Sequence, residues 1–564
     1  MKAHLATASL RFSTACVQRL FPLLVFLLPA AGQAQFNYTT NEGAVTITRY
    51  TGTGHAVTIP GTMDGLPVVR IGNQAFEFSS LTNVTIPNSV TGIGYRAFGG
   101  CTGLASVTIP NSITNIGDNA FSGCSSLTAI AVAALNPVYS SSVDGVLFNK
   151  NQTVLIQYPG GKAGSYTVAN SVTSIGSGAF SECNSLTSVA IPNSVTNIGD
   201  AALHACASMT AITVAALNPV YSSGADGVLF NKSQTFLIQY PGGKAGSYAV
   251  PGGVTDIGSG AFTGCAGLTG VTFPNSVTSI GYWAFGGCTS LTNVTIPNSI
   301  TSIGESAFGD CTSLPAITVA ALNPAYSSDA GGVLFNKSQT TLLQYPGGKA
   351  GSYTIPNSVT SIGEFAFLSC NRLTGVTIPG SVTSIGDGAF SHCSSLTSVT
   401  LPDGVTTIGD WVFQFCTSLT SVTIPNSVTY IGSHAFAYCN NLTGVYFLGD
   451  APGVDSTAFT GADNATVYYL PGTTGWELVF GGLPTELWRP RAQIGNASAG
   501  VRTNQFGFTI TGTNGMVVVV ETSTNLANPN WSPVRTNTLT GSSSYFSDPE
   551  WTSHPGRFYR LRTP

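Results

Sequence analysis

The cysteines are the residues most capable of chemistry, and eleven of the twelve share one position of a repeated sequence, the other being Cys16 near the N-terminus. Thiolates act as nucleophiles and metal ligands, but the C-x-x-C spacing of many zinc sites is absent. Disulfides are also disfavoured, because copies stacked about 4.8 Å apart would have parallel Cβ vectors rather than converging ones. We therefore expect reduced thiols buried in a core, at Cys101, Cys124, Cys183, Cys206, Cys265, Cys288, Cys311, Cys370, Cys393, Cys416 and Cys439.

Two histidines lie next to potential nucleophiles. His392 precedes Cys393, and His434 follows Ser433, so a Cys–His or Ser–His pair is one interpretation. The alternative is that His392 occupies a variable, exposed position beside a core cysteine. The residues before the other cysteines vary freely, and no third group that could orient an imidazole is identifiable. We favour the second interpretation and predict no catalytic residue and no cofactor.

Two charged patterns also recur. The segment Tyr-Pro-Gly-Gly-Lys lacks the phosphate-loop pattern, so we predict that Lys162, Lys244 and Lys349 are exposed tips. Carboxylates two residues after a repeated isoleucine could form a calcium ladder, but the dense Asp–Gly loop of calcium sites is missing. We interpret them as solvated turn residues and predict no metal site at Asp118, Asp200, Glu305, Glu364, Asp387 and Asp410.

A row of threonines is the candidate ligand face. Each threonine lies between two inward-facing apolar residues of a predicted strand, so the row should be exposed. It could bind a protein, a glycan or even ice, or it could reflect only the β-propensity of threonine and cross-strand contacts. A sugar-binding face usually adds exposed aromatic residues, and few occur here. The row contains Thr85, Thr108, Thr272, Thr295, Thr318, Thr377, Thr400 and Thr423.

These residues are carried by one repeated pattern, I-G-x-x-A-F-x-x-C-x-x-L-x-x-V-x-I-P-x-S-V-T-x. Twelve copies are present, most of them 23 residues apart, with one interval of 22 and three of 59. A fixed period of this length indicates a stacked array. The isoleucines are Ile71, Ile93, Ile116, Ile175, Ile198, Ile257, Ile280, Ile303, Ile362, Ile385, Ile408 and Ile431.

One unit shows how the array should fold. Leu104, Val107 and Ile109 predict a short strand with one apolar face, and Pro110 ends it because proline cannot donate to a ladder. The later Ala-Phe-x-x-Cys segment predicts one short helical or 3₁₀ turn with Ala, Phe and Cys packed inward. A single unit cannot bury this apolar set, whereas stacked units bury it continuously in a parallel strand ladder.

The pattern from Ile71 to Phe447 resembles the BspA-type leucine-rich repeat of bacterial proteins. This resemblance implies a right-handed, mostly β solenoid on a secreted or cell-surface protein, often one linked to adhesion and protein binding. The 59-residue intervals contain an insert of 36 residues. Val146–Phe148 and Val154–Ile156 predict two strands joined by a polar turn, and the three inserts should project on the same side.

The flanks predict further parts of the chain. Lys2, Arg11 and Arg19 precede an apolar run and small residues, which indicates a secretory signal cleaved near Ala34. After residue 488 the repeat is absent, and short alternating runs predict a small β-sandwich-like domain. We predict a signal at 1–34, a β cap at 35–70, repeats with three hairpin inserts at 71–447, a C-terminal cap at 448–488 and the β domain at 489–564.

Composition limits the possible functions. Charged residues make up 8% of the chain, against about 25% in average proteins, and no basic stripe suited to nucleic acid exists. No segment of the mature chain is apolar enough to span a membrane. We predict a secreted or cell-surface, non-catalytic scaffold that binds an extracellular protein or glycan. Alternatives are a structural spacer without a ligand and, less favoured, an enzyme in the C-terminal module, where His554 and Asp548 are the only candidates.

Overall fold

The computed structural model describes residues 35–488, 491–493, 499–502, 505–512, 516–526, 529–539, 543–553 and 556–562. The chain divides into two compact units. The first contains the described residues up to Leu291 together with Ser299–Phe308, and the second contains Thr292–Asn298 and the described residues from Gly309 onward. The predicted signal segment lies outside the described residues. Across the described ranges, no helix is both long and apolar enough to cross a bilayer.

Each regular coil contains one longer strand and one strand of two residues, as β8 (Ser106–Ile109) and β9 (Asn115–Ile116) show in the first unit. Buried and exposed side chains alternate along β8, as the two-residue period of a strand requires. Pro110 ends β8, and its carbonyl accepts a hydrogen bond from the Ile113 amide at 3.3 Å. The longer strand matches the prediction, whereas the two-residue strand at the Ile-Gly bend is too short to leave a periodic signal.

The longer strands of the first unit are β3 (Ala56–Thr58), β6 (Asn83–Thr85), β8, β10 (Ala129–Val132), β14 (Gly164–Thr167), β16 (Leu186–Ile191), β18 (Ala211–Val214), β22 (Gly246–Ala249) and β24 (Leu268–Thr272). Its two-residue strands are β7 (Gly92–Ile93), β9, β15 (Ser174–Ile175), β17 (Asn197–Ile198), β23 (Asp256–Ile257), β25 (Ser279–Ile280) and β27 (Ser302–Ile303). At its N-terminal end, β1 (Phe36–Asn41) pairs with β2 (Ala44–Tyr50), which pairs with β5 (Leu66–Ile71); β4 (Thr62–Met63) pairs with β5.

The longer strands of the second unit are β26 (Asn293–Ile296), β28 (Ile317–Val319), β32 (Gly351–Thr354), β34 (Leu373–Thr377), β36 (Ser398–Thr400), β38 (Ser421–Ile424), β40 (Gly444–Phe447), β42 (Thr466–Tyr469) and β44 (Leu483–Leu487), the last also paired with β43 (Val479–Phe480). Its two-residue strands are β33 (Ser361–Ile362), β35 (Ser384–Ile385), β37 (Thr407–Ile408), β39 (Tyr430–Ile431) and β41 (Gly453–Val454).

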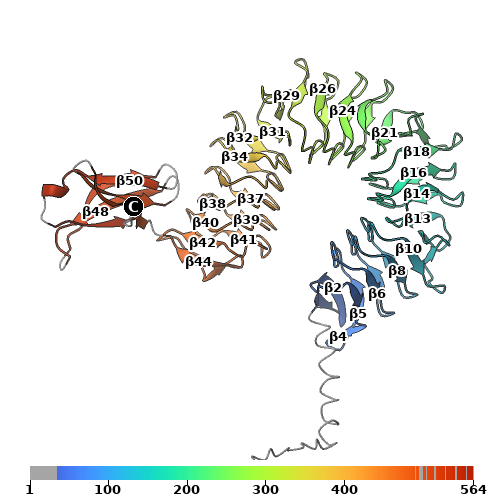
Figure 1. Cartoon of the computed structure of the whole chain (residues 1–564), viewed down its shortest axis with the longest axis horizontal. Coiled ribbons are helices and arrows are strands. Elements are labelled where there is room, and N and C mark those ends of the chain that lie inside the picture. Colours follow the sequence, from blue (N-terminus) through green and yellow to red (C-terminus); the bar gives the residue numbers. More distant parts are fainter. Residues whose placement is uncertain are drawn as a thin grey trace, which may run out of the picture. The chain divides into compact units, whose positions relative to one another are not determined.

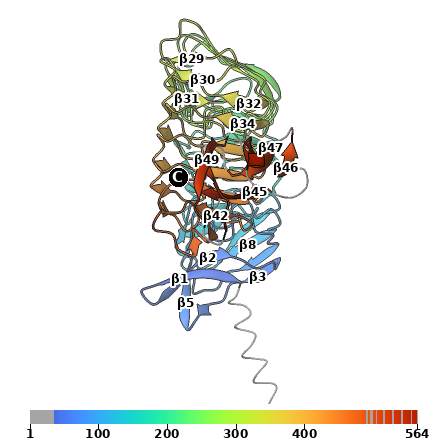
Figure 2. The same ribbon diagram turned by 90° about the vertical axis from the view of Figure 1, so that its left-hand side faces the viewer.

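Parallel pairing joins equivalent residues of successive coils. In the second unit Val376, Val399, Val422 and Val445 are consecutive partners in the longer ladder. The rows β38, β40, β42 and β37, β39, β41 run along opposite sides of this stack (Figure 1). In the turned view, β32 lies directly above β34 (Figure 2), as their pairing requires. These ladders confirm the predicted mostly β solenoid.

The turn segment is not a helix. In the coil of Ile93, Ala97 N bonds Gly94 O, Gly99 N bonds Arg96 O and Cys101 N bonds Phe98 O. Arg96 and Gly100 have φ values of 47° and 67°, and such left-handed residues prevent a right-handed helix from continuing. The described residues contain a 3₁₀ segment only at η2 (Trp551–Ser553). The expected short helical or 3₁₀ turn is therefore a chain of hydrogen-bonded turns.

Phenylalanines from successive coils form the centre of each core. In the second unit the rings of Phe367, Phe390, Phe413, Phe436 and Phe459 follow one another with centroids 4.7, 5.4, 5.3 and 5.3 Å apart. The stack continues because one coil lies on the next, and all five rings are buried. Burial of each ring contributes roughly 1.5–3 kcal/mol relative to exposure.

The inserts form part of the stack. Their strands are β11 (Tyr139–Ser141), β12 (Leu147–Asn149) and β13 (Val154–Gln157), then β19 (Tyr221–Ser223), β20 (Leu229–Asn231) and β21 (Phe236–Gln239), then β29 (Tyr326–Ser328), β30 (Leu334–Asn336) and β31 (Thr341–Gln344). The antiparallel β12–β13 hairpin matches the prediction. However, β13 also pairs in parallel with β15, and β14 pairs with β16. The second half of each insert is thus a shortened coil rather than a projection.

The C-terminal module consists of two antiparallel sheets, as expected for a sandwich-like domain. One contains β45 (Arg491–Gln493), β46 (Ala499–Arg502), β47 (Gln505–Thr511) and β50 (Ser543–Asp548). The other contains β48 (Val517–Ser523), β49 (Ser532–Thr538) and β51 (Phe558–Arg562). Phe508, Ile510, Val518, Val520 and Phe546 are buried within this module.

Candidate binding surface

The candidate threonine row lies on the outward side of the longer strands. Seven of its members are exposed, and Thr423 is half-buried. In the second unit Thr377, Thr400 and Thr423 are direct partners on adjacent strands, and Thr295 is the partner of Thr318. The row is interrupted elsewhere. The strand partner of Thr108 is an alanine of β10, and the strand partner of Thr272 is an alanine of β22.

The hydroxyl groups of this row differ from those of neighbouring threonine columns. Thr397 Oγ1 donates to Thr374 O at 3.2 Å, and Thr420 Oγ1 donates to Thr397 O at 3.3 Å, so that column uses its hydroxyls between coils. Within the ranges that the structure describes, none of the eight candidate hydroxyls forms an intramolecular hydrogen bond. The candidate row therefore presents hydroxyl groups that are free to bond a ligand.

Aromatic residues end the row in the second unit, which sequence reasoning missed. Tyr446 is the strand partner of Thr423, and Tyr468 is the partner of Tyr446. The two tyrosine rings stack with centroids 5.0 Å apart, and Trp488 lies 4.9 Å from Tyr446. The period of 23 residues from Thr423 leads to Tyr446, so the repeat itself carried the signal.

The cysteine column lies in the core and cannot supply a nucleophile. All eleven repeat cysteines are buried, and none of them forms a disulfide in the part of the chain that the structure describes. Cys393 Sγ donates to Phe367 O, and Cys416 Sγ donates to Phe390 O, both at 3.1 Å. Burial raises the pKa of Cys206 and of Cys439 to about 12. These thiols therefore stay protonated at neutral pH, and they act as small apolar residues.

Each of the two histidine rings contacts the serine that precedes it. His392 Nδ1 lies 2.9 Å from Ser391 Oγ rather than beside the Cys393 thiol, and burial lowers the pKa of His392. His434 Nδ1 lies 2.8 Å from Ser433 Oγ and 3.2 Å from Thr457 Oγ1. A nucleophile–base pair also needs donors aimed at the developing oxyanion, and these side-chain contacts supply none.

The carboxylate column stabilises turns. Asp387 Oδ1 accepts a bond from the Asp410 amide at 2.9 Å, and Asp410 Oδ1 accepts one from the Ser433 amide at 2.7 Å. Asp118, Asp200, Glu305 and Glu364 are exposed, whereas Asp387 and Asp410 are half-buried. The described ranges contain no group of three or more His, Cys, Asp or Glu side chains placed to hold a metal ion.

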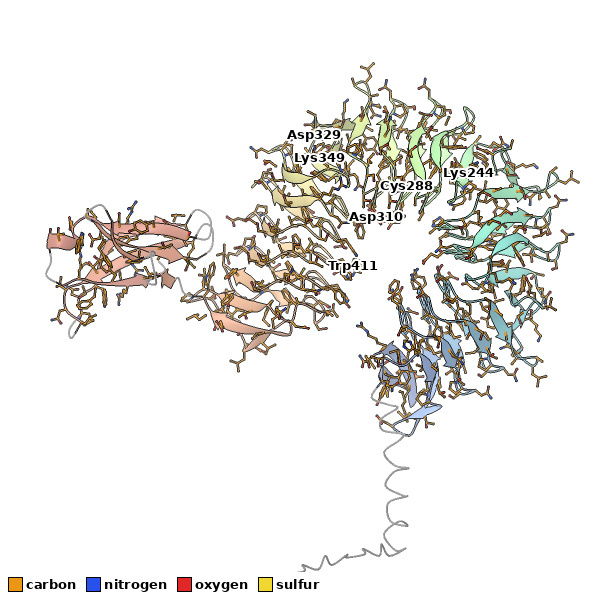
Figure 3. All side chains as sticks on the ribbon, in the orientation of Figure 1. Lys244, Cys288, Asp310, Asp329, Lys349 and Trp411 are labelled. Atoms are coloured by element: carbon orange, nitrogen blue, oxygen red, sulfur yellow. The ribbon has the colours of Figure 1, made fainter. Side chains whose placement is uncertain are left out.

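The prediction of exposed lysine tips was wrong. Lys162 Nζ donates to Asp144 O at 2.6 Å, Lys244 Nζ to Asp226 O at 2.6 Å, and Lys349 Nζ to Gly331 O at 2.9 Å. Figure 3 shows Lys349 beside Asp329. Each long side chain reaches back to the hairpin of its own insert, so the lysines fasten the hairpin to the shortened coil.

The C-terminal candidate Asp548 is buried and fully engaged. It pairs with Arg557 at 3.0 Å and accepts a bond from the Tyr559 hydroxyl at 2.8 Å. His554 lies outside the described residues. Asp548 therefore serves the packing of the module, and its geometry gives no support to a catalytic role.

The chain is similar to a known protein family and to solved structures. The family model of the BspA type leucine rich repeat region matches in six copies over residues 68–146, 160–223, 243–339 and 344–466, which is more than half of the chain. A leucine rich cell surface protein from Faecalibacterium prausnitzii is 28% identical, with 77% of this chain and 93% of that one covered and a TM-score of 0.40. No curated protein sequence matches the chain.

Two further solved structures are similar. A leucine-rich repeat protein from Bacteroides ovatus is 27% identical, with 73% of this chain and 92% of that chain covered and a TM-score of 0.26. The pneumococcal vaccine antigen PcpA is 17% identical, with 81% and 98% covered and a TM-score of 0.33.

Proposed function

The chain belongs to the BspA-type leucine-rich-repeat family, and on that basis we propose that it is a secreted or cell-surface, non-catalytic scaffold that binds an extracellular protein through its threonine face. The free hydroxyls of the candidate row are the main support. Adjacent threonine columns use their hydroxyls between coils, whereas Thr377, Thr400 and Thr423 form an uninterrupted segment with theirs unused. Stacked repeats offer such extended surfaces to partners.

The test compares the mature chain with a variant in which Thr377, Thr400 and Thr423 are replaced by valine. Valine keeps the shape and the β-propensity of threonine but removes the hydroxyl. Both proteins are applied to a panel of purified extracellular-matrix proteins and to a glycan array. We expect the wild type to retain at least one protein and the triple variant to lose it.

Thr383→Val is the control, because the Thr383 hydroxyl already donates to Thr360 O at 3.4 Å within the protein. This variant should bind as the wild type does. Equal binding by the triple variant would place the site elsewhere, and retention of glycans alone would replace the protein partner by a sugar. No retention by the wild type would favour a structural spacer.

A further inference from the structure

The turn face of the second unit carries a group of rings at strained backbone positions. His392, Trp411, Phe415, His434 and Tyr438, here called the aromatic turn face, have φ values of 60°, 56°, 57°, 54° and 59°. Left-handed conformations are unfavourable for bulky residues and ordinary for glycine. Some other coils place glycine at equivalent positions, as at Gly178, Gly260, Gly264, Gly287 and Gly388, and others place mostly small or polar residues there, as at Asn119, Ala201, Ser306, Asp310 and Ser369.

Inter-coil hydrogen bonds hold these strained residues in place. The Trp411 amide donates to Ser433 O at 2.9 Å, the Phe415 amide to Ala437 O at 2.9 Å, and the Tyr438 amide to Thr460 O at 2.7 Å. Glycine would form the same bonds without strain, so the backbone conformation does not itself require rings in three successive coils. Strain retained in this way is a reason to infer a function.

The side chains of the aromatic turn face lie outside the buried core: His392 and Trp411 are exposed, and Phe415, His434 and Tyr438 are half-buried. Trp411 is 40% exposed, and Figure 3 shows it at the turn edge of its coil. The intervening Val412 and Phe413 are buried. His392, Phe415 and Tyr438 form a surface ladder with ring centroids 4.6 and 4.7 Å apart.

The coils that carry these rings contain mostly acidic charges. Residues 355–470 contain a single basic residue other than histidine, Arg372. Burial lowers the pKa of His392, so this imidazole adds no positive charge at neutral pH. Asp387 Oδ1 and Asp410 Oδ1 each accept a hydrogen bond from a backbone amide of the next coil, which fixes the position of both carboxylates. Both residues are near the rings in the sequence. The carboxylates of this segment are Glu364, Asp387, Asp403, Asp410, Asp450, Asp455 and Asp463.

We propose that the aromatic turn face, with Asp387 and Asp410, binds basic segments of extracellular proteins. Lysine or arginine side chains would lie against the rings, where the ring quadrupole attracts a cation, and the carboxylates would supply charge complementarity. A basic peptide fits these features better than a neutral sugar, because a sugar makes no use of the charges of Asp387 and Asp410. This site is separate from the threonine face and does not depend on it.

The test uses the mature chain and a fluorescein-labelled octapeptide of alternating arginine and glycine, with a glutamate–glycine octapeptide as the comparison. Fluorescence anisotropy should detect the arginine peptide alone, and binding should weaken as the salt concentration rises. Trp411→Gly should weaken binding roughly 3- to 30-fold while leaving the melting temperature unchanged or higher, because glycine relieves the strain. Asp410→Asn keeps the Oδ1 acceptor and should weaken binding and its dependence on salt.

Trp283→Gly is the matched control, because Trp283 has the same left-handed conformation (φ 52°) in the first unit, where neighbouring coils have Gly260 and Ser306 at the equivalent positions. It should bind as the wild type does, and so should the triple threonine variant. The proposal is overturned by wild-type protein that does not bind the arginine peptide, by equal losses in Trp283→Gly and Trp411→Gly, or by a loss in the triple threonine variant. Binding of neutral maltohexaose that depends on Trp411 to the same degree would overturn it in favour of a sugar site.

Discussion

The side-chain amide of Asn136 donates a hydrogen bond of 2.7 Å to the carbonyl oxygen of Pro110, the residue that follows strand β8 of the preceding coil. Asn136 Nδ2 also bonds Ile113 O, and its Oδ1 accepts bonds from the amides of Val138 and Tyr139. This fully buried side chain therefore joins the first insert to the regular coil before it.

Asn136→Ala should lower the free energy of unfolding by roughly 2–4 kcal/mol, because it leaves buried carbonyl and amide groups without partners. Urea denaturation followed by circular dichroism measures the change. Asn111→Ala, at an exposed turn position of the same coil, should change stability by less than about 0.5 kcal/mol. Similar losses in both variants would contradict this role for Asn136.

The glycine of the Ile-Gly bend is required by close packing between coils. A Cβ on Gly386 would lie 2.5 Å from Glu364 N and 2.8 Å from Glu364 Cα, and backbone atoms cannot move aside without disturbing the ladder. Gly386→Ala should destabilise the protein by roughly 1–3 kcal/mol in thermal or urea unfolding. Gly380→Ala is the control, because a Cβ added there would meet nothing within 4 Å, and it should be nearly neutral.

The buried cysteine column predicts thiols that react only after unfolding. We expect a folded chain of residues 35–564 to react with Ellman's reagent at none of the eleven repeat cysteines on the time scale of minutes, because burial excludes the reagent and disfavours the thiolate. Addition of urea should make all eleven reactive. Rapid reaction of even one thiol in the folded protein would contradict the burial described here.

His204 makes stability depend on pH. Burial lowers its pKa to about 4, whereas an unfolded histidine titrates near 6.5. Below pH 6.5 the unfolded chain binds a proton that the folded chain does not, so stability is lost as the pH falls from 6.5 to 4. His204→Leu, which places the residue found at Leu368 in an equivalent position, should reduce this loss. Parallel pH profiles of the urea midpoint for both proteins would contradict the prediction.

The repeat determined the fold because each unit contributes the same apolar set every 23 residues. Stacking is what buries that set. The sequence therefore predicted the longer strands, the inward faces and the β12–β13 hairpin. The same alternation indicated that Thr377 and Thr400 point outward. Local patterns of this kind act within a few residues, and a single sequence displays them directly.

Contacts between coils were decided by the tertiary structure. The left-handed turn residues depend on inter-coil amide bonds such as Trp411 N to Ser433 O, and no local propensity indicates them. Lys162 Nζ donates to a carbonyl oxygen 18 residues away. A lysine that the sequence suggested was an exposed tip therefore connects the hairpin of its insert to the shortened coil. His392, Phe415 and Tyr438 form one surface only because the coils stack in register. Sequence alone supplied the repeating unit, and the three-dimensional stack decided which of its variable positions meet.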